Sequence, residues 1–236
     1  MAGDGRAAQK RRAGPRPPFP NRAAAPPPLP TRYPPGGRRE SSIKAQRITI
    51  INGHPDPDPA RFLHALADTY AGAASAAGHE VRRIDVASIE FDLIASRAEW
   101  EDGPLPRAIA AAQDDIVWAE HLVIFYPLWL GDLPALLKGF FEQVMRPGFA
   151  FHPRPKGFPE KALKGRTAHA VVTMGMPAVF YRFYYGAHSL RSLERNILGF
   201  VGIAPVERSI VGNVEGDPKH RSMWLETMTA RGAAGR

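Results

Sequence analysis

The segment that most constrains the fold is a short apolar run, Leu122–Pro127, which leads almost directly into a helical pattern. The run reads LVIFYP, so its residues are apolar at both odd and even positions. A strand of this kind is typical of the centre of a parallel sheet, where helices cover both faces. Apolar residues at helical spacing then fill Leu133–Val144. We therefore expect a central parallel strand followed by a crossover helix.

The rest of the chain repeats this alternation of strand and helix. The expected further strands are Arg47–Asn52, Val81–Val86, Ala168–Thr173 and Pro205–Val211. The expected further helices begin near Ala60 and end at Gly78, cover residues 105–121, and cover Ser189–Leu198. Strands joined by helices form parallel sheets through right-handed crossovers. The sequence therefore predicts a doubly wound, three-layer α/β sandwich with a five-stranded parallel sheet.

The net charge of +8 lies entirely in residues 1–46, which hold ten Lys or Arg and two acids, while the remaining residues balance. The same segment holds ten of the 24 prolines. Such a composition cannot bury enough apolar surface to offset its ordering entropy. We predict a disordered basic tail over residues 1–46 and a folded domain over residues 47–236. The tail's role stays open between an over-long start, a solvated arm and a targeting peptide.

Composition also excludes several classes of protein. The 236 residues contain no cysteine, which excludes disulfides, thiolate metal sites and cysteine nucleophiles. We expect a cytoplasmic protein, because this usage fits a reducing compartment. No apolar run is long enough to span a bilayer. We predict no metal site, and no nucleic-acid binding because the basic tail has almost no interleaved aromatic residues.

Ligands of doubly wound sheets bind at the carboxyl ends of the strands, which directs attention to the loops that begin at Gly53, Tyr126 and Thr173. The first loop enters a helix N-terminus, where amide groups and the helix dipole attract phosphate. Arg61 and His54 are its candidate phosphate contacts. The alternative is a proline-stiffened turn with an aspartate cap, and the residues of this loop alone favour that alternative.

The other two loops contain aromatic and polar candidates. Trp129 presents a flat apolar surface where the central strand ends, which fits a planar heteroaromatic cofactor, although a lone tryptophan is by default a core residue. Gly175 would let the backbone approach a ligand closely. Tyr181 and His188 are polar side chains in an aromatic segment, and the alternatives are a buried tyrosine and a structural histidine.

Taken together, the segments FDLIASRAEWEDG, PLWLGDLPALLKG and TMGMPAVFY resemble the flavodoxin-like NAD(P)H:quinone oxidoreductases. That family includes mammalian quinone reductase, the potassium-efflux ancillary oxidoreductases and the modulator of drug activity B type. The resemblance covers about residues 47–212. It implies the flavodoxin-like strand order 2-1-3-4-5, a bound flavin (FAD or FMN), NAD(P)H as co-substrate, and a homodimer with its catalytic sites at the subunit interface.

The resemblance also implies roles for individual residues. Tyr181 corresponds to the family's catalytic tyrosine, and His188 corresponds to its catalytic histidine with one residue inserted. His54 matches the histidine that opens the phosphate loop. The residues expected to wrap the isoalloxazine ring are Pro127, Leu128, Trp129 and Leu130, and those expected to line its pyrimidine edge are Thr173, Met174, Gly175 and Met176.

One departure from the family lies in the phosphate loop. The family often has a Ser/Thr-Ser-Phe-Asn run there, whereas this chain has Asp58–Arg61 followed by Phe62. We expect the loop to hold phosphate through backbone amides and Arg61, or else to bind its flavin more weakly. In the third loop, Gly175-Met176 stands where the family has a pair of glycines. The C-terminal part of the chain is short, so the bound flavin could be FMN as well as FAD.

The family resemblance implies an NAD(P)H dehydrogenase (quinone) that passes a hydride through flavin to a quinone-like small molecule by a ping-pong mechanism. Azo or nitro compounds are alternative acceptors. A second alternative is a flavoprotein subunit that docks on a membrane transporter. An electron carrier is disfavoured because the expected domain is electrically neutral, whereas carriers usually dock through a charged patch.

Overall fold

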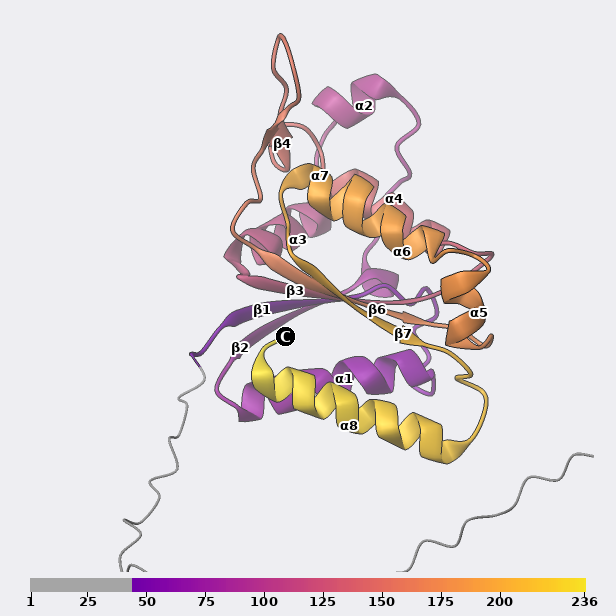
Figure 1. Ribbon diagram of the computed structural model, residues 1–236. Helices are drawn as coiled ribbons and strands as arrows, with labels where there is room; N and C mark the ends of the chain where they lie inside the picture. Colours follow the sequence, from indigo (N-terminus) through magenta and orange to yellow (C-terminus); the bar gives the residue numbers. More distant parts are fainter. Residues whose placement is uncertain (1–43) are drawn as a thin grey trace, which may run out of the picture. The chain divides into compact units, whose positions relative to one another are not determined.

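A five-stranded parallel sheet lies at the centre of the protein in the computed structural model, which describes residues 44–236 (Figure 1). Its order is β2-β1-β3-β6-β7, which is the predicted order 2-1-3-4-5 because β6 and β7 are its fourth and fifth strands. The tail predicted over residues 1–46 falls, except for its last three residues, outside the described part. The strands are β1 (Arg47–Asn52), β2 (Glu80–Asp85), β3 (His121–Pro127), β6 (Thr167–Thr173) and β7 (Val206–Val211).

Strand β3 is buried over its whole length, as its sequence predicts. Leu122 and Ile124 belong to the larger apolar cluster on one face of the sheet. Val123 and Phe125 belong to the smaller cluster on the opposite face. Neighbouring side chains of a strand point to opposite faces, so both faces of β3 need a covering layer of helices. The prediction of a three-layer sandwich is confirmed.

Helices α1 (Phe62–Ala76) and α8 (Pro218–Ala234) cover one face of the sheet (Figure 1). Helices α3 (Arg107–Trp118), α4 (Ala135–Val144) and α6 (His188–Ser192) lie on the other face. Helix α6 continues through a π-helical segment, η2 (Leu193–Leu198), into α7 (Gly199–Val201). The remaining described elements are the short helix η1 (Val86–Ser88), α2 (Arg97–Asp102), α5 (Ala178–Phe183), and the paired strands β4 (Phe151–His152) and β5 (Glu160–Lys161).

Helix α8 is the largest element that the sequence analysis missed. It carries no clear apolar stripe, and only Met228 and Gly232 are buried. Its packing on α1 depends on a close approach instead, because a Cβ added to Gly232 would lie 2.4 Å from the backbone oxygen of Tyr70. Contact through small residues leaves little hydrophobic periodicity to detect. Within residues 44–236, no helix is long and apolar enough to cross a membrane.

Candidate functional site

A cleft of about 720 Å³ opens at the carboxyl end of the sheet. The loops after β1, β3, β6 and β7 form its walls, together with the first turn of α8. Strands β1 and β3 are neighbours in the sheet, and the helices that follow them, α1 and α4, lie on opposite faces. Doubly wound folds bind their ligands at such a switch point. The predicted cofactor residues that line it are His54, Arg61, Phe62, Pro127, Leu128, Trp129, Thr173, Met174 and Gly175.

The loop after β3 places Trp129 at the rim of the cleft. The side chain is half exposed. Trp129 N donates to Asp132 O at 3.0 Å, and Asp132 N donates back to Trp129 O at 2.9 Å. The turn between them has positive φ at both Leu130 (48°) and Gly131 (81°), which is the type I′ pattern. Leu130 itself points fully into solvent and does not line the cleft, so the prediction that it wraps the ligand is not supported within this chain.

The loop after β6 supplies the polar wall. Thr173 ends the strand, and its carbonyl oxygen accepts a hydrogen bond from Leu128 N at 2.8 Å, which joins this wall to the loop after β3. Gly175 follows with an exposed backbone. Met176 turns away and packs against the larger apolar cluster, so the structure does not place it in the cleft as predicted.

The two predicted catalytic residues also lie outside the cleft lining. Tyr181 is 1% exposed, and its hydroxyl is 2.7 Å from Ser189 Oγ and accepts a hydrogen bond from Leu190 N at 3.2 Å. His188 is exposed at the start of α6. The catalytic role of Tyr181 therefore stays a prediction that this geometry does not favour, because its hydroxyl is already engaged within the core.

His54 lies at the base of the loop after β1. Its ring meets Trp129 edge-on at 6.1 Å and lies 5.2 Å from the ring of His64. Asp56 N donates to His54 Nδ1 at 3.0 Å, so this nitrogen is an acceptor. Burial, with His64 nearby, lowers the pKa of His54 below its usual range. His54 is therefore neutral at pH 7 and contributes no charge to an anion site.

Arg61 faces the cleft but is already paired. Its Nη2 lies 2.7 Å from Asp56 Oδ2 and 3.6 Å from Asp58 Oδ2. Two carboxylates therefore neutralise the charge of Arg61. This pairing weakens the prediction that Arg61 is the side-chain phosphate contact.

Three charged residues of the cleft, Asp56, Glu215 and Arg221, were not among the site residues predicted from the sequence. Glu215 follows the carboxyl end of β7, so the rule that identified the other loops could have found it. Asp56 belongs to the first loop, where only Arg61 and His54 were expected to face a ligand. Arg221 comes from α8, and a helix that is not predicted cannot direct a residue to a site. Among residues 44–236, no carboxylate lies within ion-pair distance of Arg221.

Residues 46–231 match a protein family described by its flavodoxin-like fold. The chain belongs to this family. It is 28% identical to an uncharacterised NAD(P)H oxidoreductase of Haemophilus influenzae over 182 residues. The aligned region covers 75% of this chain and 89% of the relative. It is 23% identical to NAD(P)H dehydrogenase [quinone] 1 of Rattus norvegicus, over 75% of this chain and 72% of that protein.

Solved structures show the same likeness. The NAD(P)H:quinone oxidoreductase from Methanothermobacter marburgensis superposes with a TM-score of 0.69 and 26% identity, over 81% of this chain and 100% of that one. An FMN-dependent NADH-azoreductase from Bacillus anthracis, solved with FMN, superposes with a TM-score of 0.64 at 17% identity, and this likeness concerns the fold alone.

The cleft fits a flavin. Its volume lies in the range of cofactor pockets. Trp129, Pro127 and Leu128 offer an apolar wall, and the adjoining loop adds the backbone at Met174 and Gly175 and a threonine, Thr173. Arg221 supplies an uncommitted positive charge for a phosphate at the edge. These residues match the two halves of a flavin, which is a planar ring system that carries a polar, phosphorylated tail.

Proposed function

We propose that the protein is a flavin-dependent NAD(P)H oxidoreductase that reduces quinone-like small molecules by a ping-pong mechanism. The observation that carries the proposal is the half-exposed Trp129, held at the rim of a cleft at the switch point of the sheet. A tryptophan left half exposed beside an apolar wall favours a planar ligand. The names of the relatives support the same chemistry.

The flavin, when bound, supplies the transfer of two electrons and a proton between a nicotinamide and an acceptor. The chain's own residues have simpler tasks. Pro127 and Leu128 exclude water from one side of the cleft. Thr173 and the Gly175 backbone present hydrogen-bonding groups to a polar ring edge. Arg221 would hold the phosphate of a bound flavin, and His54 stays neutral against Trp129.

We further propose a homodimer. Phe180 of α5 and Tyr184, which follows the end of that helix, stack with ring centroids 4.7 Å apart, and Phe183 between them in sequence is 75% exposed. An aromatic patch of this kind is costly to leave in water and marks an interaction surface. Size-exclusion chromatography with light scattering should give twice the chain mass, and Phe183→Ser should shift it toward the monomer. A monomeric wild type would contradict this proposal.

The cytoplasmic location remains a prediction. So does the alternative of a subunit that docks on a membrane transporter.

The visible spectrum of the purified full-length protein tests the proposed function. We expect flavin absorption that NADH or NADPH bleaches anaerobically and that a quinone restores. Release of the bound pigment and chromatography will identify it as FMN or FAD. A protein that is colourless and takes up no added flavin would refute the proposal.

A matched pair of variants links the spectrum to the cleft. Trp129→Ala should weaken flavin binding, because it removes the flat apolar surface of the rim. Trp118→Ala removes a tryptophan that packs under Arg82 outside the cleft, and it should leave flavin binding unchanged. Equal loss in both variants would mean that Trp129 acts through general stability and not through contact with the ligand.

A further inference from the structure

We propose that Asp56 is a specificity-determining residue of the cleft: its carboxylate holds Arg61 and a loop amide that a flavin phosphate would otherwise use. It thereby reduces the preference for phosphorylated flavins over riboflavin. This inference rests on the proposed flavin site. It concerns the loop between β1 and α1, residues 53–61.

The backbone donors of this loop are already engaged. Asp58 N donates to Asp56 Oδ1 at 3.0 Å, and Ala60 N donates to Asp58 Oδ1 at 3.0 Å. Pro57 and Pro59 have no N–H to offer. In loops that bind phosphate before a helix, such amides point at the ligand. Here carboxylate oxygens of the chain accept hydrogen bonds from two of these amides instead.

The side-chain donor of the loop is engaged in the same way. Arg61 Nε and Nη2 lie 2.8 and 2.7 Å from Asp56 Oδ2. The amide of Asp58, and then Arg61, hold the pKa of Asp56 below its usual range, so the carboxylate is charged at neutral pH. Two carboxylates and one guanidinium leave this segment with a net charge of −1. A phosphate that binds the Nε–Nη2 edge of Arg61 must therefore displace Asp56 from it.

Two histidines hold the backbone at Asp56, so the loop cannot simply move its carboxylate aside. His64 Nε2 lies 2.9 Å from Asp56 O, and His54 Nδ1 accepts from Asp56 N. Asn52 Nδ2 lies 2.8 Å from both Asp85 Oδ1 and His64 Nδ1.

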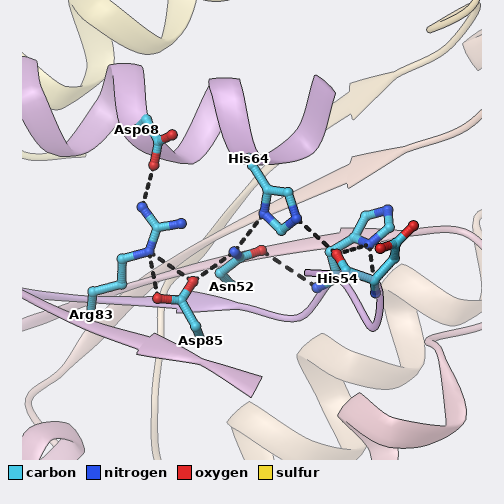
Figure 2. A network of polar contacts seen from close by, with 7 residues as sticks. Asn52, His54, His64, Asp68, Arg83 and Asp85 are labelled. Carbon is cyan, nitrogen blue, oxygen red and sulfur yellow. Dashed lines mark hydrogen bonds and ion pairs between the residues drawn. The ribbon is translucent and has the colours of Figure 1, made fainter. Parts of the chain in front are cut away.

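The hydrogen-bond network also sets the tautomer of His64. An ionised carboxylate can only accept, so the Asn52 group that faces Asp85 is its amide nitrogen, a donor. That nitrogen must then donate to His64 Nδ1, which leaves the His64 proton on Nε2, where it donates to Asp56 O. Figure 2 shows this chain running from β2 through β1 to α1. With the backbone held in this way, Arg61 is freed by rotation of the Asp56 side chain or of its own half-exposed side chain.

Asp56→Asn tests this inference, because it keeps the shape of the side chain and an oxygen for Asp58 N while it removes the charge that holds Arg61. We expect the Kd of FMN to fall by about tenfold, the scale of one charge-assisted hydrogen bond, and the Kd of riboflavin to stay within about twofold. Quenching of flavin fluorescence on flavin-stripped protein measures both constants. Riboflavin lacks the phosphate, so the ratio of the two constants isolates its contribution.

Asp68→Asn is the matched control. Asp68 also pairs with an arginine, Arg83, and lies on α1, but outside the cleft. It should leave the FMN-to-riboflavin ratio unchanged. Arg61→Gln should cost little FMN affinity in the wild-type background, where Arg61 is neutralised. The same change in the Asp56→Asn background should abolish the tenfold gain.

Several outcomes would overturn the inference. An unchanged or lower preference for FMN in Asp56→Asn would do so, as would an equal gain in Asp68→Asn. If Asp56→Asn binds neither flavin or fails to fold, Asp58→Asn provides the test, because it removes a second charge that faces Arg61. If Asp58→Asn does not gain affinity for FMN, the inference is wrong. A wild type that binds neither flavin would refute the proposed function itself, whereas flavin binding without these gains overturns only the role of Asp56.

Discussion

Two buried histidines should make this protein lose stability as the pH falls from 7 to 5. His121 and His169 lie on β3 and β6, are 4% and 0% exposed, and face the layer that α1 and α8 form. Each has one ring nitrogen bonded to a hydroxyl, at 2.7 Å from Thr167 and 2.9 Å from Ser209. The other ring nitrogen of each has no partner in the described chain. A proton added there would be a buried charge without an acceptor.

The size of the effect follows from the pKa values. Burial, helped by the nearby charge of Arg231, lowers the pKa of His121 to about 4 and that of His169 to about 3, although Glu207 partly opposes the shift of His121. In the unfolded chain a histidine has a pKa of about 6.5. Below about pH 6.5 the unfolded state binds protons at these histidines and the folded state does not. The free energy of unfolding therefore falls as the pH falls. Between pH 7 and 5 each histidine should remove about 2 kcal/mol, and the two together about 4 kcal/mol.

Urea unfolding at pH 7, 6 and 5, followed by tryptophan fluorescence, measures the effect. The window lies above the range where most carboxyl groups titrate, so the histidines dominate it. His169→Gln keeps a polar group near Ser209 but cannot titrate, and it should halve the loss between pH 7 and 5. His152→Gln changes an exposed histidine and should leave the loss as in the wild type.

A loss below about 1 kcal/mol in the wild type would refute the reasoning, because it would mean that the folded protein accepts these protons with little penalty. An equal loss in His169→Gln and the wild type would show that His169 is not among the groups responsible. A protein that unfolds at pH 5 altogether would agree with the expected direction, and the pH 6 measurement would then give the size.

Three further predictions concern single side chains. Tyr181→Phe removes the hydroxyl bonded to Ser189 and should lower the free energy of unfolding by about 1–2 kcal/mol; the rate of flavin reduction in stopped flow should not change, and a slower rate would restore a catalytic role for this tyrosine. Gly232→Ala places a Cβ 2.4 Å from the Tyr70 backbone oxygen, so Tm should fall although alanine favours helix, and a higher Tm would contradict the packing of α8 on α1. Leu130 has a left-handed backbone conformation, which glycine adopts without strain, so Leu130→Gly should raise the free energy of unfolding in urea by about 1 kcal/mol. Leu130→Ala should not raise it, because alanine keeps a Cβ.

The layers of the fold could be predicted because burial leaves a repeating mark on the sequence. Strand β3 is apolar at every position since two helical layers cover it, and its neighbours follow the same alternation of strand and helix. The loops at the carboxyl ends of β1, β3 and β6 followed from topology, which places them at one edge of the sheet. Trp129 and Gly175 lie in the cleft for that reason.

The features that were not predicted leave a weaker pattern in the sequence. Helix α8 packs through Gly232 and shows little periodicity, so neither the helix nor Arg221 at its first turn was anticipated. Tyr181 matched a family position in the sequence, yet its hydroxyl is directed into the core by its contact with Ser189. Alignment places a residue along the chain, whereas the direction of its side chain depends on what packs around it.

The sequence by itself determined the five strands of the sheet and the helices between them, the central position of β3 and the edge of the sheet that carries the cleft, because these follow from hydrophobic pattern and chain connectivity. Only the tertiary structure decided which charges in the cleft remain available. Asp56, Asp58 and Arg61 lie within six residues of one another, and their types alone allow either a phosphate site or a self-paired turn. The distances between their side-chain atoms, set by the clamp on Asp56 from His64 and His54, favour the self-paired turn in this chain. Electrostatic pairing depends on separations of a few ångströms, which sequence spacing does not specify.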